Sequence, residues 1–228
     1  MTRREPDDEE GADVSELAAV ILCGGESRRM GRPKAWLPLG GETLLGRIVR
    51  IASTAAEPVV VVAAAGQDLP ELATPVILER DPAPGLGPLQ GLAAGLAPLP
   101  SSVEFVYATA VDAPFLEPAW IGRLVELIGD RDVAVPWIEG RRHPLASLYR
   151  ARPAREAALQ LLDEGVLRLT ALVERLRARD VSADEMRLVD PDLRSLRNLN
   201  TPADYQTAAS RFFERTEGRE GLGETNSG

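Results

Sequence analysis

The chain has 228 residues, of which 44% are hydrophobic and 27% are charged, and its formal net charge at pH 7 is -9. This length suits one domain with a sizeable core, and the acidic balance excludes general nucleic-acid binding because no basic excess exists to neutralise a phosphate backbone. The single cysteine, Cys23, excludes an internal disulfide framework and a thiolate metal cluster, and it fits a reducing compartment.

Both ends of the chain are polar and rich in acidic residues or glycine. Too little apolar surface is present there to order the backbone, so residues 1–15 and 216–228 are predicted to be disordered extensions of a single domain, 16–215. The sequence holds no apolar run long enough to span a membrane and no signal-peptide pattern. These features predict a cytoplasmic protein with no membrane partner.

Strand and helix patterns alternate along the chain. The apolar run 17–22 predicts a strand buried on both faces, and Thr43 is predicted to cap a helix. Further strands are expected at 58–65, 75–78, 104–110, 132–137, 144–149 and 186–189. Further helices are expected from Pro88, over 118–128, 154–163 and 170–177, and after the cap Thr201. This alternation predicts an α/β fold, in which helices flank a mostly parallel twisted sheet with right-handed crossovers.

The loop after the first strand, Leu22 to Lys34, combines glycine with positive charge. Gly24 and Gly25 allow a sharp turn and a close approach of a ligand to their N–H groups. Cations follow at Arg28, Arg29 and Lys34. Such a loop suits a polyphosphate, because arginine offers a planar fork of donors and lysine a mobile point charge. The alternative is a solvated basic loop, and the glycine spacing matches neither the dinucleotide fingerprint nor a Walker loop.

Asp112 comes directly after the predicted strand 104–110, where an α/β sheet presents polar groups to ligands. A carboxylate at this position can hold Mg²⁺ against the phosphates of a nucleotide. The alternative role is a turn or helix-capping aspartate before Pro118.

The run LCGGESRRMGRPKAWLPLGG resembles the signature loop of the MobA-like nucleotidyltransferase family, and within it most closely that of the molybdenum cofactor guanylyltransferases. The resemblance covers about residues 17–205 and implies a Rossmann-like fold of the nucleotide-diphospho-sugar-transferase type. Cys23 stands where alanine is common. After the second strand the chain has only small residues where some members carry an asparagine, so Gln67 or Asp68 would have to supply that contact.

By resemblance, the activity is transfer of GMP from GTP to molybdopterin with release of pyrophosphate and with Mg²⁺ as cofactor. DAPFL matches the family's metal-binding segment, which implies that Asp112 is the metal ligand, with Arg28 and Lys34 as further catalytic residues. DPAPGLGPLQG, residues 81–91, matches the base-recognition loop and favours guanine. The implied nucleotide-binding residues are Leu22, Cys23, Gly24, Gly25, Arg28, Lys34, Asp81, Pro88, Leu89, Gly91 and Asp112.

Candidate acceptor-binding residues lie later in the chain. Arg141 and Arg142 are placed to meet the phosphate of a second substrate, or else form a solvated face. His143, the only histidine, begins a segment that resembles the family's H-P-x-x-A-L pattern, although a lone histidine often serves only as a structural hydrogen-bonding group. In the family-like N-x-N-T-P segment, Asn200 is favoured over Asn198 as a contact to metal or acceptor, and its alternative role is to cap the helix.

Other functions fit the same motifs. The donor can be CTP, as in a molybdopterin cytidylyltransferase, or the acceptor can be a sugar phosphate; the 81–91 loop is where these enzymes would differ. A chain of a different class would be a catalytically inactive nucleotide-binding regulatory module, against which the intact Lys34 and Asp112 argue. The resemblance also implies protein partners among the enzymes that make or receive the cofactor.

Overall fold

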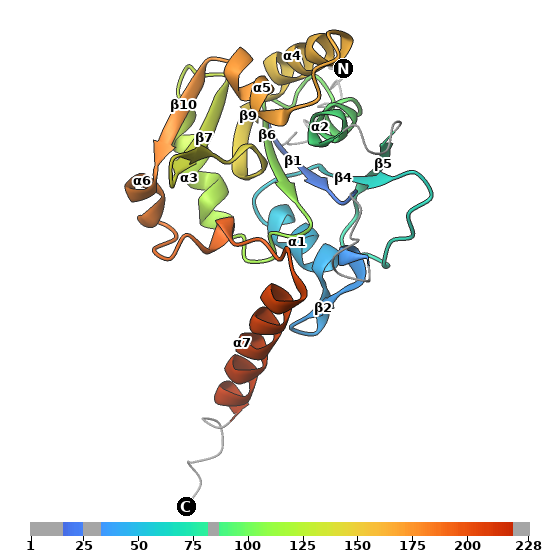
Figure 1. Ribbon diagram of the computed structural model, residues 1–228, viewed down its shortest axis with the longest axis vertical. Coiled ribbons are helices and arrows are strands. Elements are labelled where there is room, and N and C mark those ends of the chain that lie inside the picture. Colours follow the sequence, from blue (N-terminus) through green and yellow to red (C-terminus); the bar gives the residue numbers. More distant parts are fainter. Residues whose placement is uncertain (1–15, 25–32, 82–86, 221–228) are drawn as a thin grey trace, which may run out of the picture.

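A computed structural model describes residues 16–24, 33–81 and 87–220. In these residues, strands β10, β7, β9, β6, β1, β4 and β5 form the main sheet in that order, with β8 pairing with β7 (Figure 1). The strands are β1 (Leu17–Leu22), β2 (Pro38–Leu39), β3 (Glu42–Thr43), β4 (Val59–Ala64), β5 (Ile77–Asp81), β6 (Phe105–Ala110), β7 (Val133–Ile138), β8 (Arg141–Arg142), β9 (Ser147–Arg150) and β10 (Ala178–Ser182). The α-helices are α1 (Leu44–Ser53), α2 (Pro88–Leu96), α3 (Pro118–Ile128), α4 (Ala151–Asp163), α5 (Leu169–Arg175), α6 (Ala183–Arg187) and α7 (Pro202–Glu220).

Strand β1 lies in the middle of the sheet and runs parallel to both of its neighbours. Leu22, its last residue, is in register with Val62 of β4 and with Ala110 of β6. The carboxyl ends of β1, β4 and β6 therefore lie together at one edge of the sheet. Strand β1 is in the middle, where the strand order reverses direction. Only β8 and β9 run antiparallel to their partners in the described main sheet, so the predicted mostly parallel sheet is confirmed.

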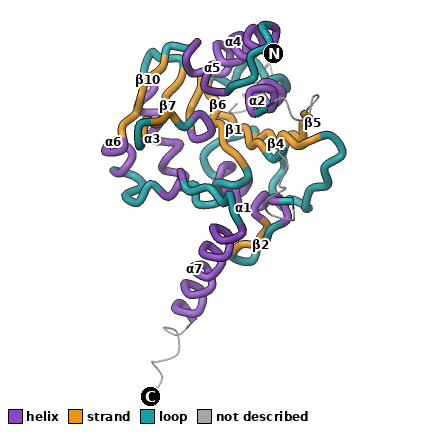
Figure 2. Tube along the Cα trace, viewed as in Figure 1, coloured by secondary structure: helices purple, strands orange, loops and turns teal. Residues whose placement is uncertain are grey.

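Helices cover both faces of the sheet (Figure 2), and each face has its own hydrophobic core. Along β1, Ala19 and Ile21 point into the core that α1 and α3 cover, whereas Val20 and its even-numbered neighbours point into the core under α2, α4 and α5. All three residues have no exposed surface. Both sides of β1 are thus buried, which explains why its sequence is uniformly apolar and not alternating.

Local signals set the helix ends. The Thr43 hydroxyl accepts a hydrogen bond from the backbone of Gly46 and caps α1, as predicted. At the start of α7, Thr201 and Asp204 exchange side-chain and backbone hydrogen bonds in a capping box. Helix α7 then extends away from the sheet domain (Figure 1) and continues to Glu220, beyond Thr216, where the sequence predicted a disordered tail.

Two predicted elements were wrong. The segment 186–189 is not a strand; β10 lies earlier, and a capping box between Ser182 and Glu185 starts α6, which contains Met186. Among the described strands, β10 pairs only with β7, and Val181 is its one fully buried residue. The strand therefore has no continuous apolar run in its sequence. In 144–149, Pro144 begins a short 3-10 helix before β9, since proline has no N–H to donate to a neighbouring strand.

No helix in the described part of the chain is both long enough and apolar enough to cross a bilayer.

Candidate active site

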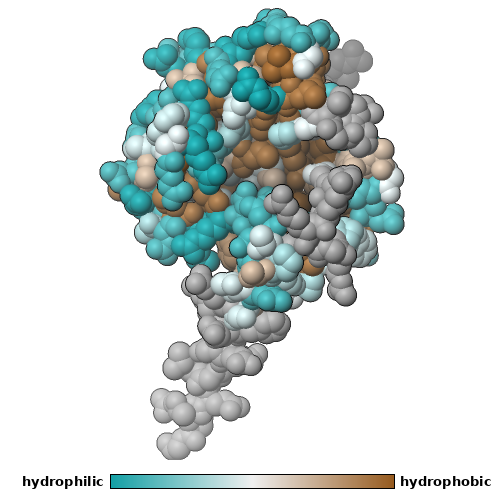
Figure 3. All heavy atoms as spheres, viewed as in Figure 1, coloured by the Kyte–Doolittle hydropathy of each residue, from teal (hydrophilic) through white to brown (hydrophobic). Residues whose placement is uncertain are grey.

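A cleft of about 520 Å³ opens at the carboxyl ends of β1, β4 and β6. Figure 3 shows apolar residues gathered in a hollow on this face of the molecule, with hydrophilic residues around it. Most of the described nucleotide-binding candidates line the cleft: Leu22, Cys23, Gly24, Lys34, Asp81, Pro88, Gly91 and Asp112. The sheet thus brings together residues from widely separated parts of the sequence.

The first turn after β1 is held against β4. The backbone N–H groups of Cys23 and Gly24 both donate to the carbonyl of Val62, at 2.8 and 3.2 Å. A Cβ at Gly24 would lie 3.3 Å from the backbone nitrogen of Ala64, so a side chain would push the turn away from β4. Gly25, Arg28 and Arg29 lie outside the described residues, and their predicted phosphate contacts stay predictions.

Lys34 and Asp112 form an ion pair inside the cleft. The Lys34 Nζ lies 2.8 Å from Asp112 Oδ2, and each side chain keeps 17% of its surface exposed. Lys34 enters from a short 3-10 helix, Lys34–Trp36, and Asp112 from the turn after β6. Lys34 is also the only lysine of the chain, in which arginine supplies the other basic side chains. The single lysine of the sequence thus lies where a compact, mobile charge meets the Asp112 carboxylate.

The Asp112 carboxylate fits the predicted metal. Its second oxygen, Oδ1, is buried and has no hydrogen-bond partner among the described residues. No three His, Cys, Asp or Glu side chains form a metal cluster in residues 16–24, 33–81 and 87–220. A single carboxylate with an unused oxygen suits Mg²⁺, which takes its other ligands from water and from phosphate oxygens.

The described ends of the predicted base-recognition loop, Asp81 and residues 87–91, contribute to the lining of the cleft, and residues 82–86 lie outside the described residues. Asp81 ends β5, while Pro88 and Gly91 lie in the first turn of α2, the helix that begins after Gly87. The side chain of Leu89 is fully buried in the core and does not line the cleft. Any contact of Leu89 with a base would therefore come from its backbone.

Gln67 ties the first turn to the end of β4. Its side-chain oxygen accepts from the Ala64 N–H at 3.0 Å, and its Nε2 donates to the Cys23 carbonyl at 3.3 Å. Arg80 in turn donates to the carbonyls of Ala64 and Gln67. The sequence offers Gln67 as a direct nucleotide contact, but in the structure both ends of its amide bind protein groups. Burial also raises the pKa of the Cys23 thiol, which Gln67 contacts, to about 11.

A second hollow of about 380 Å³ adjoins the cleft and shares Pro88, Leu145 and Asn198 with it. The predicted acceptor residues Arg141, Arg142 and His143 all line this second hollow. Arg142 is already engaged, because its guanidinium donates twice to the Asp180 carboxylate at 2.7 and 2.8 Å. Burial, and then the charge of Arg141, lower the pKa of His143, which favours the neutral imidazole.

Asn198 lines both the cleft and the second hollow, whereas Asn200 lines neither. The backbone of Asn200 is used at the start of α7, where its N–H donates to the Asp204 carboxylate. Arg168, which the sequence did not single out, also lines the second hollow from the residue before α5. It has no motif of its own, and only the packing of α5 against the segment 144–146 brings it there.

Residues 19–181 match the model of the MobA-like NTP transferase domain. Over 203 residues the chain is 40% identical to a protein from Mycobacterium avium (strain 104) named probable molybdenum cofactor guanylyltransferase, and the match covers 87% of this chain and 98% of the relative. A relative of the same name from Mycobacterium tuberculosis is 41% identical over 196 residues, with 84% and 92% covered.

Two solved structures show the same fold. Molybdopterin-guanine dinucleotide biosynthesis protein A from Archaeoglobus fulgidus matches with a TM-score of 0.70 at 23% identity, over 87% of this chain and 99% of its own. The 2-C-methyl-D-erythritol 4-phosphate cytidylyltransferase from Thermus thermophilus matches with a TM-score of 0.63 at 18% identity, over 84% and 96%. These likenesses confirm the predicted fold class.

Proposed function

The chain belongs to the MobA-like NTP transferase family, and we propose that it transfers GMP from GTP to the terminal phosphate of molybdopterin with release of pyrophosphate. In this reaction an oxygen of the acceptor phosphate attacks the α-phosphorus of GTP, and the bond from that phosphorus to the β-phosphate oxygen breaks. The relatives at 40% and 41% identity are named for guanylyl transfer, which supports GTP over CTP as donor.

The observation that carries the proposal is the Lys34–Asp112 pair in a cleft at the joined ends of β1 and β6. Phosphoryl-type transfer needs in-line placement of the two phosphates and compensation of negative charge, with little covalent help from the protein. Lys34 would supply a charge that follows the phosphates as the pyrophosphate leaves. Gly24 lets the turn after β1 pack closely against the backbone of Ala64, which holds the start of the proposed phosphate loop at the cleft.

Asp112 is the residue that would hold Mg²⁺, since its Oδ1 has no other partner in the described structure. When bound, the ion neutralises phosphate charge and lowers the barrier to departure of pyrophosphate. Asn198, on the same cleft wall, is the second candidate to face that ion or the acceptor phosphate.

The second hollow is the proposed entry for the acceptor phosphate. Arg141 and Arg168 line it, and no ion pair of either is found among the described residues. His143, held neutral by burial, can offer a hydrogen bond without adding charge. Arg142 would act indirectly, because Asp180 holds its guanidinium on the rim.

The test is a thermal-shift titration with GTP, CTP, ATP and UTP, each with and without Mg²⁺, on the wild type and on Asp112→Asn. A ligand that binds only the folded state raises the melting temperature, so we expect the largest shift with GTP and a further increase with Mg²⁺. Asp112→Asn should lose the Mg²⁺-dependent part alone. Asp163→Asn, a change at the end of α4, is the matched control.

A preference for CTP would assign the chain to cytidylyl transfer. No shift with any nucleotide would contradict the proposal and support an inactive regulatory module.

A further inference from the structure

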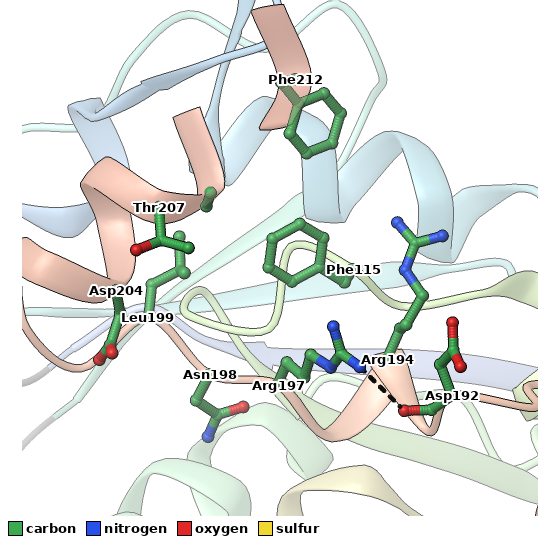
Figure 4. Close-up of a pocket in the computed structure, with 10 residues that line it drawn as sticks. Phe115, Asp192, Arg194, Arg197, Asn198, Leu199, Asp204, Thr207 and Phe212 are labelled. Atoms are coloured by element: carbon green, nitrogen blue, oxygen red, sulfur yellow. Dashed lines mark hydrogen bonds between the residues drawn. The ribbon is translucent and has the colours of Figure 1, made fainter. Parts of the chain in front are cut away.

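A third hollow, of about 640 Å³, lies beside the cleft and has no role in nucleotide binding as proposed. It is enclosed by the first part of α7, by the segment 192–199 and by the turn after β6. Figure 4 shows Phe115 in its middle, with Phe212 on one side and Arg194, Arg197 and Asn198 around it. Asn198 lines this hollow as well as the cleft, so the two cavities share a wall.

Aromatic rings and guanidinium groups are layered in this third hollow. Phe115 and Phe212 are stacked with 5.9 Å between their ring centroids and 17° between their planes. The Arg194 guanidinium carbon lies 5.9 Å from the Phe115 centroid, and that of Arg47 lies 4.6 Å from the Phe212 centroid. Phenyl faces and guanidinium planes both stack on flat heterocycles.

Polar groups with unused capacity stand next to these rings. The Arg197 guanidinium is exposed and donates only to the backbone carbonyl of Asp192, at 3.3 Å, among the described residues. The Asp192 carboxylate makes no hydrogen bond or ion pair with any described residue. A guanidinium and a carboxylate that line the same hollow can together bind a ring edge that carries both carbonyl acceptors and amino donors.

The wall between the third hollow and the cleft is fixed to the segment that carries Asp112. The Leu199 N–H donates to the backbone carbonyl of Asp112 at 2.8 Å, and the Leu199 side chain is 3% exposed. A molecule with its phosphate at Asn198 can therefore place that phosphate near Asp112 and extend its other end into the third hollow.

We propose that the third hollow binds the ring system of the acceptor, a planar heterocycle with amino and carbonyl groups joined to the phosphate that attacks GTP. This inference rests on the proposed function and extends it. The phosphate lies at Asn198, where the three cavities meet. The Arg194 guanidinium stacks on the ring with the side that does not face Phe115, and Asp192 and Arg197 bind the edge of the ring.

The test measures the Michaelis constant for molybdopterin at saturating GTP in Arg197→Ala and Asp192→Asn. Both residues are exposed, so both variants should fold. We expect the constant to rise about 10-fold or more, as for loss of a hydrogen bond to a charged group, with kcat and the GTP thermal shift within about twofold of wild type. Arg152 is an exposed arginine on α4, and Arg152→Ala is the control for loss of charge. This variant should change neither the Michaelis constant for molybdopterin nor kcat.

Two outcomes would overturn the inference in different ways. If Arg197→Ala and Asp192→Asn both leave the constant unchanged, the ring does not bind in the third hollow and the inference fails, while the proposed function stands. If the wild type binds GTP but releases no pyrophosphate with molybdopterin, the acceptor itself is wrong. Direct binding of a fluorescent pterin phosphate to wild type and Arg197→Ala gives a readout that does not depend on turnover.

Discussion

Replacement of Lys34 by arginine keeps the positive charge, and we expect it to abolish most of the activity. Among the 26 basic residues of the chain, Lys34 is the single lysine, so arginine is the side chain used wherever a fixed cation suffices. A guanidinium is planar and wider than an ammonium, and it cannot occupy the place of a point charge 2.8 Å from Asp112 while also following the leaving phosphates.

The magnitude follows from the two roles of the pair. Loss of one preorganised cation that meets developing charge lowers kcat by about 10²–10³, equal to about 3–4 kcal/mol. In Lys34→Ala the Asp112 carboxylate, only 17% exposed, also loses this partner, which costs about 1–3 kcal/mol of stability and lowers Tm by about 2–12 °C. Lys34→Arg should lose a similar factor in kcat but keep Tm close to wild type.

Pyrophosphate release at saturating GTP and molybdopterin measures kcat, and urea unfolding measures stability. The double variant Lys34→Ala/Asp112→Asn removes the uncompensated carboxylate, so it should recover most of the lost stability and none of the activity. Reductive methylation gives an independent check, since Lys34 and the N-terminal amine are the only amines available, and GTP should protect Lys34. Near wild-type kcat in Lys34→Arg would refute the reasoning that this site needs a lysine.

Three further predictions concern packing, pH and the first turn. Gly95→Ala places a Cβ 2.9 Å from a methyl of Val62 and against Val20, so it should lower the free energy of unfolding in urea by about 1–3 kcal/mol. Gly122→Ala, whose Cβ would have nothing within 4 Å, should raise that free energy by about 0.5–1 kcal/mol. Burial lowers the pKa of His143 below its ordinary 6.5, so the unfolded chain binds the proton more tightly than the folded chain does. The free energy of unfolding should therefore fall as the pH drops below about 6.5, and His143→Asn should reduce this loss of stability. Gln67→Ala frees the turn after β1 and should raise the Michaelis constant for GTP about 10-fold at unchanged Tm; an unchanged constant would show that the turn holds without this amide.

The central strands were predictable because both of their faces are buried. In β4 every residue from Val59 to Ala63 is buried, so the apolar run itself marks the strand. Strand β10 follows the opposite rule: it lies at the sheet edge, and Arg179 and Asp180 reach solvent and pair with side chains of neighbouring elements. A strand that is stabilised by backbone pairing and surface ion pairs has no hydrophobic pattern from which it could be predicted.

The candidate nucleotide-binding residues could be placed together from the sequence where a motif directly follows a strand. Asp112 comes two residues after β6, so the parallel register alone places it beside the turn after β1. Arg168 shows the limit, because no strand end or glycine marks it; it reaches the second hollow only through the way α5 packs. Contacts made by helix packing depend on the whole core, and a local pattern does not encode them.

The two asparagines of the N-x-N segment show how a local boundary decides a site. In an extended chain, residues two apart point to the same side, so the sequence Asn198-Leu199-Asn200 would offer both amides to the cleft once Leu199 is buried. At Asn200 the chain instead turns into α7, which begins at Pro202, and the Asn200 N–H donates to the Asp204 carboxylate. That turn leaves Asn198 alone on the cleft wall. The sequence predicts Thr201 as the helix cap. The start of the helix, and not the asparagine motif, therefore separates Asn198, which lines the cleft, from Asn200, which contacts Asp204.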